Sequence, residues 1–238
     1  MTETFLWVEF EINLFFEHQA NRDIRPGLYQ SRPTVSRGGK SKTMCARPKR
    51  GRFIGIIMGM CFLLSATGLD GAQINGVDFE EALLINGNRL TLRGGSLLRY
   101  LVVIKAYAGA FYLEAGLPSD RALDDVARQL VLHYFHAIPA DGFAKATSAM
   151  IEKNVTPEQF ARMAPRIDRM NALYRDVTPG DRYTATYLPG IGTELALNGQ
   201  PLGTVPGADF ARAFFSIWIG AHPIDKGFRN DLLKGVSP

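Results

Sequence analysis

The chain has 238 residues, of which 46% are hydrophobic and 21% charged. This composition is typical of a globular protein and excludes a disordered or wholly membrane-embedded chain. The formal net charge of +4 arises before residue 73, because residues 1–72 contain 10 basic and 6 acidic side chains whereas residues 73–238 contain 17 of each, so the larger part has no net charge to attract nucleic acid.

Residues 44–72 have the order of a secretory signal peptide. Basic residues come first, an apolar run follows from Phe53 to Leu64, and small residues come after it. The run is shorter than the roughly 20 residues that a membrane-spanning helix needs. We therefore expect an exported, periplasmic protein that meets a membrane only through this leader, with a retained N-terminal anchor as the alternative.

Two further segments precede and follow this leader. Residues 1–43 contain a stretch rich in Pro, Arg, Ser and Gly, which is expected to be a mis-assigned or disordered extension. No repeat or linker interrupts residues 73–238, so these are predicted to form a single domain.

Three strands are predicted in the first half of this domain. Arg89 to Arg93 alternates apolar and polar residues between turn signals at Asn86–Gly87 and Gly94–Gly95. Arg99 to Glu114 is rich in Val, Ile, Tyr and Leu and is predicted to be one long central strand, covered on both faces. Leu130 to Ile138 is predicted to be the next strand.

Helices and further strands are predicted after residue 138. The best defined helix begins at Thr156, because Pro157 suits the first turn and Gln159 can complete a capping box. Asn198–Gly199 is a strong hairpin signal. The predicted elements are helix Pro139–Lys153, helix Thr156–Val177, strands Tyr183–Leu188, Thr193–Leu197 and Leu202–Val205, and helices Phe210–Ile219 and Gly227–Leu233. This order predicts an α+β fold with a mostly antiparallel sheet.

Neither a metal site nor a cofactor is expected. His133 and His136 are three residues apart in a predicted strand, so their side chains point to opposite faces. Both cysteines, Cys45 and Cys61, precede the domain, which therefore has no thiolate for zinc or for nucleophilic catalysis. No serine lies in a nucleophile-elbow motif.

Arg99 and Tyr107 are the most informative pair of polar residues. They are eight residues apart, so on one continuous strand both would face the same side, together with Leu101, Val103 and Lys105. A guanidinium and a phenol on an apolar face can hold a carboxylate or a phenolate. The simpler interpretation of the spacing alone is that Arg99 is a solvated strand end and Tyr107 an ordinary core residue.

Several motifs resemble those of the bacterial chalcone isomerase-like family. Leu90-Thr-Leu-Arg-Gly-Gly-Ser-Leu-Leu-Arg99 followed by Lys105-Ala-Tyr107-Ala-Gly-Ala-Phe-Tyr-Leu113 is similar to its glycine-rich turn, arginine and tyrosine, with the same interval of eight residues. Tyr187-Leu-Pro-Gly-Ile-Gly-Thr193 fits its hairpin, and Trp218-Ile-Gly-Ala-His-Pro-Ile-Asp225 fits its closing signature. The matches run from about residue 77 to residue 235.

This resemblance implies an open-faced β-sandwich, in which a curved antiparallel sheet carries helices on one face and a ligand cleft lies between. In the plant isomerases an arginine steers the substrate's phenolate and a flavanone ring closes without a cofactor. Fatty-acid-binding relatives use the matching arginine with a tyrosine to hold a carboxylate. Arg99 matches that arginine and Tyr107 that tyrosine, where the enzymes typically have threonine.

The chain departs from the enzymes on the helix after residue 138. Where they have a phenol and, seven residues later, an amide, the alignment places Phe143 and Met150. Neither donates a hydrogen bond, and losing one oxyanion donor typically costs about 100-fold or more in rate. Asn154 could supply the amide if a gap shifts the alignment.

The first hypothesis is therefore a non-catalytic protein that binds a small amphipathic carboxylate such as a fatty acid. Arg99 and Tyr107 would grip the carboxylate, and Lys105 could add to the positive charge. The residues expected to sheath the tail are Leu101, Val103, Phe143 and Phe214. The alternative is a cofactor-free intramolecular lyase of the chalcone isomerase type, which would act on an unknown enone with Arg99 and Tyr107 as catalytic residues and would take a phenolic ligand in place of the carboxylate. A structural or partner-binding role is the third hypothesis.

Overall fold

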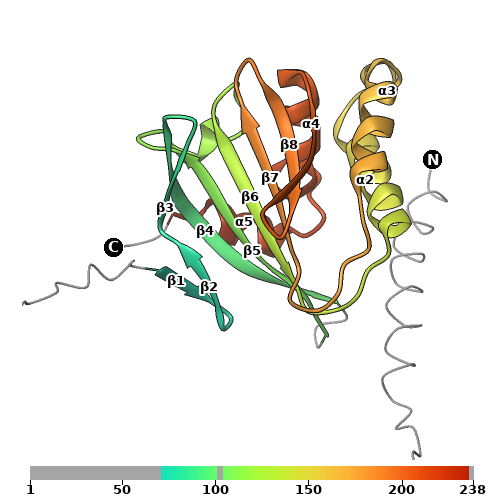
Figure 1. Cartoon of the computed structure of the whole chain (residues 1–238). Helices are drawn as coiled ribbons and strands as arrows, with labels where there is room; N and C mark the ends of the chain where they lie inside the picture. Colours follow the sequence, from blue (N-terminus) through green and yellow to red (C-terminus); the bar gives the residue numbers. More distant parts are fainter. Residues whose placement is uncertain (1–70, 101–103, 236–238) are drawn as a thin grey trace, which may run out of the picture.

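The computed structural model describes residues 71–100 and 104–235, which form a curved antiparallel sheet with helices layered on one face (Figure 1). The predicted α+β architecture is thus confirmed. The strands are β1 Gly71–Ile74, β2 Val77–Glu80, β3 Ala82–Ile85, β4 Asn88–Tyr100, β5 Ile104–Glu114, β6 Arg128–Tyr134, β7 Arg182–Leu188, β8 Gly192–Leu197 and β9 Gln200–Val205. The helices are η1 Ser119–Arg121, a 3₁₀ turn, and α2 Ala140–Asn154, α3 Pro157–Leu173, α4 Ala208–Ile219 and α5 Lys226–Leu233.

Strands β3 to β9 lie side by side in the order of the sequence, each antiparallel to the next. Asparagine–glycine pairs make three of the hairpin turns, at Asn75–Gly76, Asn86–Gly87 and Asn198–Gly199. Both residues of each pair have positive φ, the conformation that matches a tight turn to the twist of its strands. The hairpin of β1 and β2 was not predicted, although it carries this same turn signal.

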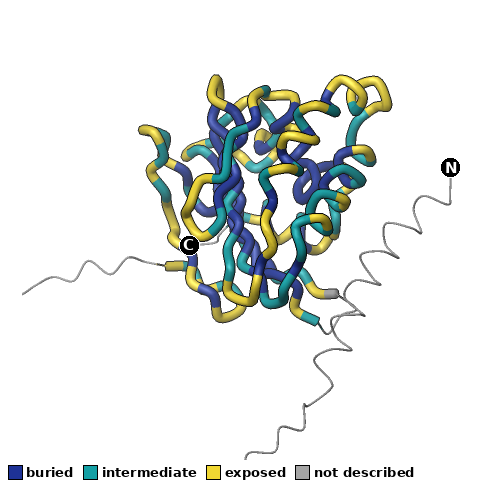
Figure 2. The backbone as a smooth tube through the Cα atoms, turned by 45° about the vertical axis from the view of Figure 1, so that its right-hand side comes forward, coloured by how far each residue is buried: buried dark blue, intermediate teal, exposed yellow. Residues whose placement is uncertain are grey.

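The core lies on both faces of the sheet. One cluster, with Phe111, Leu130 and Phe214 among its members, fills the space between the sheet and the helices. A smaller cluster, with Phe79 and Tyr112, lies beneath the β1–β2 hairpin. Residues 106–113 of β5 are all buried, which confirms that this strand is covered on both faces. Figure 2 shows the buried residues concentrated along the middle of the sheet.

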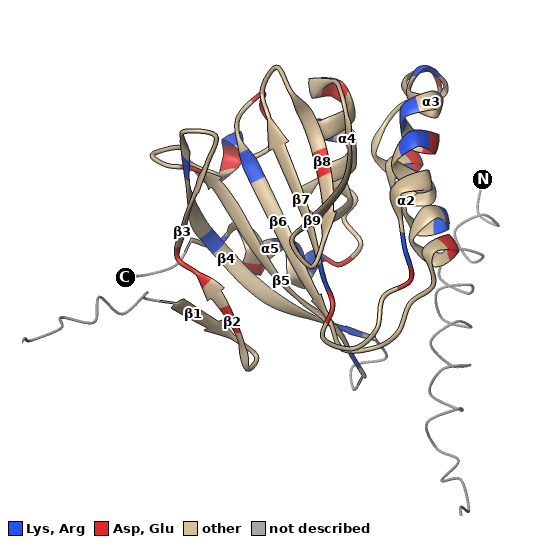
Figure 3. Ribbon diagram, viewed as in Figure 1, with Lys and Arg blue, Asp and Glu red and all other residues tan. Residues whose placement is uncertain are grey.

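The capping box predicted at Thr156 is present, because its hydroxyl accepts from the Gln159 N–H and the Gln159 side chain accepts from the Thr156 N–H. The buried stripe of α3 is Met163, Ile167 and Met170. Figure 3 shows both acidic and basic residues along this helix. Helix α4 is apolar on nearly all sides and is buried accordingly.

The predicted continuous strand from Arg99 to Glu114 is wrong. Strand β4 ends at Tyr100 and β5 begins at Ile104, and the two strands pair antiparallel as a hairpin. The interval of eight residues between Arg99 and Tyr107 therefore spans two strands and no longer places both side chains on one face. Strand β6 also ends earlier than predicted, and Ile138 instead forms an isolated bridge with Val177.

The predicted turn at Gly94–Gly95 is also wrong, because β4 runs through both glycines. A register shift lies at this point, between Leu92 and Gly94. A Cβ on Gly94 would overlap the main-chain oxygen of Asp231 in α5, and one on Gly95 would overlap the side chain of Ile74 in β1. The two glycines therefore allow a helix and a hairpin to approach the same strand from opposite faces.

The predicted extension, residues 1–43, and the apolar run of the predicted leader lie outside the described residues, as do Leu101 and Val103. Strand β1 begins at Gly71, two residues before the predicted start of the domain. Within the described ranges no helix combines the length and the apolar character that crossing a membrane requires.

Candidate functional site

Tyr107 lies near the start of β5, where it pairs with Leu98 of β4 on one side and with Tyr134 of β6 on the other. Its side chain points into the cluster between the sheet and the helices and is only 7% exposed. The indole N–H of Trp218 in α4 donates a hydrogen bond of 3.2 Å to its hydroxyl oxygen. The hydroxyl is thus held at the junction of the sheet and α4.

Aromatic rings surround this phenol. Tyr134 and Phe228 contact it edge-on, with ring centroids 5.6 and 5.5 Å away. Burial raises the pKa of Tyr107 well above its ordinary value, an effect that the hydrogen bond from Trp218 only partly offsets. Tyr107 is therefore a neutral hydrogen-bond donor at physiological pH and cannot act as a base.

Phe143 and Phe214, two predicted lining residues, join the same cluster from different helices. Phe143 of α2 stacks on Tyr174 at 5.3 Å and contacts Tyr134 edge-on, also at 5.3 Å. Phe214 of α4 contacts Trp218 edge-on at 5.4 Å. The structure therefore links Phe143, Tyr107 and Phe214 through Tyr134 and Trp218.

Arg99 and Lys105 lie outside this group. Their Cα atoms are paired across β4 and β5 beside a register shift, and both residues are exposed. The Lys105 ammonium lies 5.9 Å from the ring of Phe135, which packs against the second cluster, beneath the β1–β2 hairpin. Among the described residues, neither side chain is in hydrogen-bonding contact with Tyr107.

In α2, Phe143 and Met150 occupy the positions where the plant isomerases have hydrogen-bond donors, and neither side chain can donate a hydrogen bond. Met150 is 4% exposed and apolar. The amide of Asn154 is fully engaged, because its Nδ2 donates to the carbonyls of Met150 and His222 at 2.9 and 2.8 Å while its Oδ1 accepts from the His222 N–H at 3.0 Å. Asn154 therefore anchors the segment after α4 and has no N–H left for a ligand.

Sequence reasoning missed a pair of hydroxyls inside the aromatic cluster. Thr147 of α2 and Tyr174, the residue after α3, are hydrogen-bonded at 2.8 Å and are both buried. Burial raises the pKa of Tyr174 above its ordinary value, although the Thr147 hydrogen bond lowers it in part. The apolar stripe of the predicted helix contained Tyr174, but no local pattern indicated its partner.

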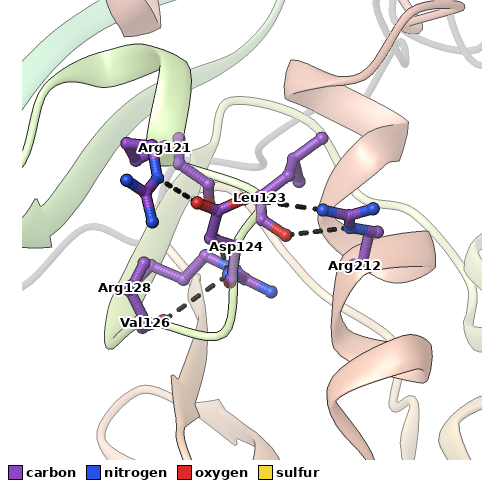
Figure 4. A network of polar contacts seen from close by, with 7 residues as sticks. Arg121, Leu123, Asp124, Val126, Arg128 and Arg212 are labelled. Atoms are coloured by element: carbon purple, nitrogen blue, oxygen red, sulfur yellow. Dashed lines mark hydrogen bonds and ion pairs between the residues drawn. The ribbon is translucent and has the colours of Figure 1, made fainter.

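A fully buried arginine was also missed. Arg128 of β6 lies between the rings of Tyr187 and Phe215, 4.6 and 4.8 Å from their centroids, and its Nη1 donates to main-chain oxygens of the loop before β6, among them that of Asp124 at 2.6 Å. Desolvation lowers its pKa to about 10. Figure 4 shows this arginine with Asp124, which also forms ion pairs with Arg121 and Arg212. Arg128 thus fixes a loop and is not part of the Tyr107 cluster.

A cavity of about 300 Å³ lies at the end of α4 and is lined by residues 119–120, 122–123 and 219–221 together with Arg229 and Leu233. None of the predicted site residues lines it. The Arg229 Nε donates to the carbonyl of Ile219, the residue that follows Trp218. The residues that line this cavity include neither Tyr107 nor Trp218, Tyr134 or Phe228, which contact Tyr107.

No group of three or more His, Cys, Asp or Glu residues is placed to hold a metal ion within the part of the chain that the structure describes. The Nδ1 atom of His133 accepts a hydrogen bond of 3.4 Å from Arg182. Desolvation lowers the pKa of His133, and the Arg182 charge lowers it further.

Comparison with known proteins identifies a family and a fold for this geometry. A family model described as chalcone isomerase-like matches residues 71–234. The crystal structure of an Arabidopsis thaliana fatty-acid binding protein resembles this chain with a TM-score of 0.53 and 19% sequence identity, covering 66% of this chain and 92% of that one. At this identity the likeness shows the fold. No curated protein sequence matches the chain.

Proposed function

Since the chain belongs to the chalcone isomerase-like family, we propose that its domain binds a small amphipathic carboxylate, such as a fatty acid, and does not catalyse isomerisation. The carboxylate would meet the hydroxyl of Tyr107 and the guanidinium of Arg99. The apolar tail would lie among the aromatic residues that join α2 and α4 to the sheet.

The observation that carries this proposal is the buried hydroxyl of Tyr107 inside an aromatic cluster. An apolar setting with one well-placed donor suits a ligand that has an apolar body and an acceptor at one end. Burial excludes water, so a hydrogen bond to a carboxylate there is stronger than it would be at the surface. The fold agrees, because a solved protein with this fold is a fatty-acid binding protein.

Arg99 supports the proposal through its place at the end of β4. It follows Leu98, the residue paired with Tyr107, and its own partner Lys105 is two residues from Tyr107. An arginine side chain is long, and its guanidinium offers a rigid fork of donors for a carboxylate. Arg99 is exposed, so binding would require it to turn over the end of the sheet toward Tyr107.

The helix residues argue against the isomerase alternative. Phe143 and Met150 stand where the enzymes need donors, and the amide of Asn154 is already engaged with the backbone. An oxyanion that develops on a substrate would therefore meet no free donor from these three positions of α2, although such donors supply a large share of the rate in acyl and enolate chemistry.

Substitution of Arg99 and Tyr107 tests this function. Arg99→Ala and Tyr107→Phe are each expected to weaken dodecanoate binding by about 10-fold or more, because each removes a hydrogen bond to a charged group. Calorimetric titration of the purified protein measures the loss. Arg89→Ala is the matched control, since Arg89 is an exposed residue at the other end of the same strand, and it should leave the affinity unchanged. Equal binding by all variants, or chalcone cyclisation that Arg99→Ala abolishes, would contradict the proposal.

We also propose that residues 44–72 direct export to the periplasm. Strand β1 begins at Gly71, and its Ile74 packs against Gly95. Cleavage after Gly68 would keep this strand whole, whereas cleavage after Ala72 would divide it. N-terminal sequencing of the protein from the periplasmic fraction is expected to start at Leu69; a protein that stays in the cytoplasm with its leader intact would contradict the proposal.

A further inference from the structure

Among the phenols of the aromatic cluster, Tyr107 differs from Tyr174 and Tyr183 in how its hydroxyl is bonded. The hydroxyl of Tyr183 both donates to the carbonyl and accepts from the N–H of Arg175, at 2.8 and 2.7 Å. The hydroxyl of Tyr174 is paired with Thr147. Tyr107 instead accepts from Trp218, and its own proton has no acceptor among the described residues.

The chemistry of the indole decides the direction of this bond. Tryptophan has one N–H donor and no acceptor, so the oxygen of Tyr107 must be the acceptor. The proton of Tyr107 then has to point away from Trp218. Burial raises the pKa of this phenol, which keeps the proton in place.

We propose that Trp218 is a positioning residue that holds the Tyr107 hydroxyl as a donor and so makes the site select carboxylates over neutral head groups. This inference rests on the proposed function. A carboxylate only accepts hydrogen bonds, and it matches a hydroxyl whose donor side is presented to the ligand. Without the indole N–H, the Tyr107 hydroxyl can rotate, and its oxygen can equally well accept a hydrogen bond from a donor on the ligand.

Packing holds both partners in this arrangement. The Tyr107 ring lies between Tyr134 and Phe228. Trp218 is 9% exposed and is held by Phe214 one turn earlier in α4. A donor held by fixed rings does not lose side-chain freedom when the ligand binds, which favours affinity.

The test compares two ligands with the same tail, dodecanoate and dodecan-1-ol, by calorimetric titration of the full protein. Trp218→Phe is expected to weaken dodecanoate binding about 5- to 10-fold and to leave dodecanol binding nearly unchanged, because one oriented hydrogen bond is lost. Tyr107→Phe, which removes the hydroxyl itself, should weaken dodecanoate binding at least as much. The double variant should lose no more than Tyr107→Phe alone, since Trp218 acts through the hydroxyl.

Two further variants separate positioning from packing. Replacing Trp218 with benzothienylalanine keeps the fused ring and removes the N–H, so it should reproduce the effect of Trp218→Phe even if the smaller ring disturbs the fold. Phe214→Leu changes packing beside Trp218 without touching a polar group, and it should alter the affinities for both ligands in parallel.

Either of two outcomes overturns the inference while the proposed function stands: equal losses for the acid and the alcohol in Trp218→Phe, or losses that multiply in the double variant. A wild-type protein that binds neither ligand overturns the proposed function, and this inference falls with it.

Discussion

Raising the pH above 10 is expected to destabilise the domain, with a loss of about 3 kcal/mol of unfolding free energy at pH 11 and about 6 kcal/mol at pH 12. Burial raises the pKa values of Tyr107, Tyr134 and Tyr174 above that of a free phenol. Above pH 10 the unfolded chain releases these protons while the folded domain keeps them. The stabilisation they provide is therefore present below pH 10 and is lost as the pH rises.

The size of the effect is counted from these three phenols alone; burial also raises the pKa values of Tyr112, Tyr183 and Tyr187, which act in the same direction. Each phenol that stays protonated only in the folded state lowers the free energy of unfolding by about 1.4 kcal/mol per pH unit above 10. Arg128 opposes this, because its folded pKa of about 10 lies below its ordinary value; deprotonation therefore favours the fold above pH 10 and offsets about one of the three phenols. Single domains have an unfolding free energy of about 5 to 15 kcal/mol. The expected loss is therefore a large part of the total stability.

Urea unfolding at a series of pH values, followed by fluorescence, measures the loss, and tyrosinate absorbance reports when the phenols ionise. Tyr134→Phe is the informative variant, because it removes one titrating group and should make the decline with pH less steep. A stability that stays level from pH 9 to pH 12 would show that the phenols ionise freely in the folded domain.

The second large effect is expected at Gly94, where Gly94→Ala should lower the unfolding free energy by about 3 kcal/mol or more. The added methyl would overlap the main-chain oxygen of Asp231, with that of Leu232 at 3.0 Å. Neither oxygen can move unless α5 lifts from β4. Lifting α5 would expose Phe228 and Leu232, which are 2% and 0% exposed.

Gly142→Ala provides a control of opposite sign. Gly142 lies inside α2, and a Cβ there would meet its nearest neighbour at 3.5 Å, an ordinary contact. Alanine is the better helix former, so this variant should gain about 0.5 to 1 kcal/mol. Equilibrium unfolding of both variants gives the comparison, and protease resistance of the C-terminal segment shows whether α5 has detached. Similar stabilities for the two variants would refute the contact at Gly94.

Local signals in the sequence were enough to predict most of the fold. The capping box at Thr156 and the Asn198–Gly199 turn depend on neighbouring residues alone, and both are present as predicted. The hairpin between β4 and β5 was missed because residues 101–103 read Leu-Val-Val, a run typical of strand interiors. Gly94 and Gly95 do mark a special position in the chain. They are needed because α5 and β1 approach the strand closely from its two faces, and not because the chain turns there.

The site was less accessible to sequence reasoning. The family resemblance singled out Tyr107, but its hydrogen bond joins residues 111 positions apart, and no spacing rule reports such a contact. The buried position of Arg128 was equally hidden, because an arginine at the start of a strand ordinarily reaches solvent.

The packing of α5 against β4 also bears on how the protein is made. The hydrogen bond from Ser96 to Asp231 joins residues 135 positions apart, so one face of β4 stays uncovered until α5, the last helix of the described residues, has been synthesised. A nascent chain cannot cover that face until α5 has emerged from the ribosome. The domain can therefore complete its fold only after α5 has been synthesised, and a premature stop codon before Lys226 would leave a chain with this surface permanently open to aggregation.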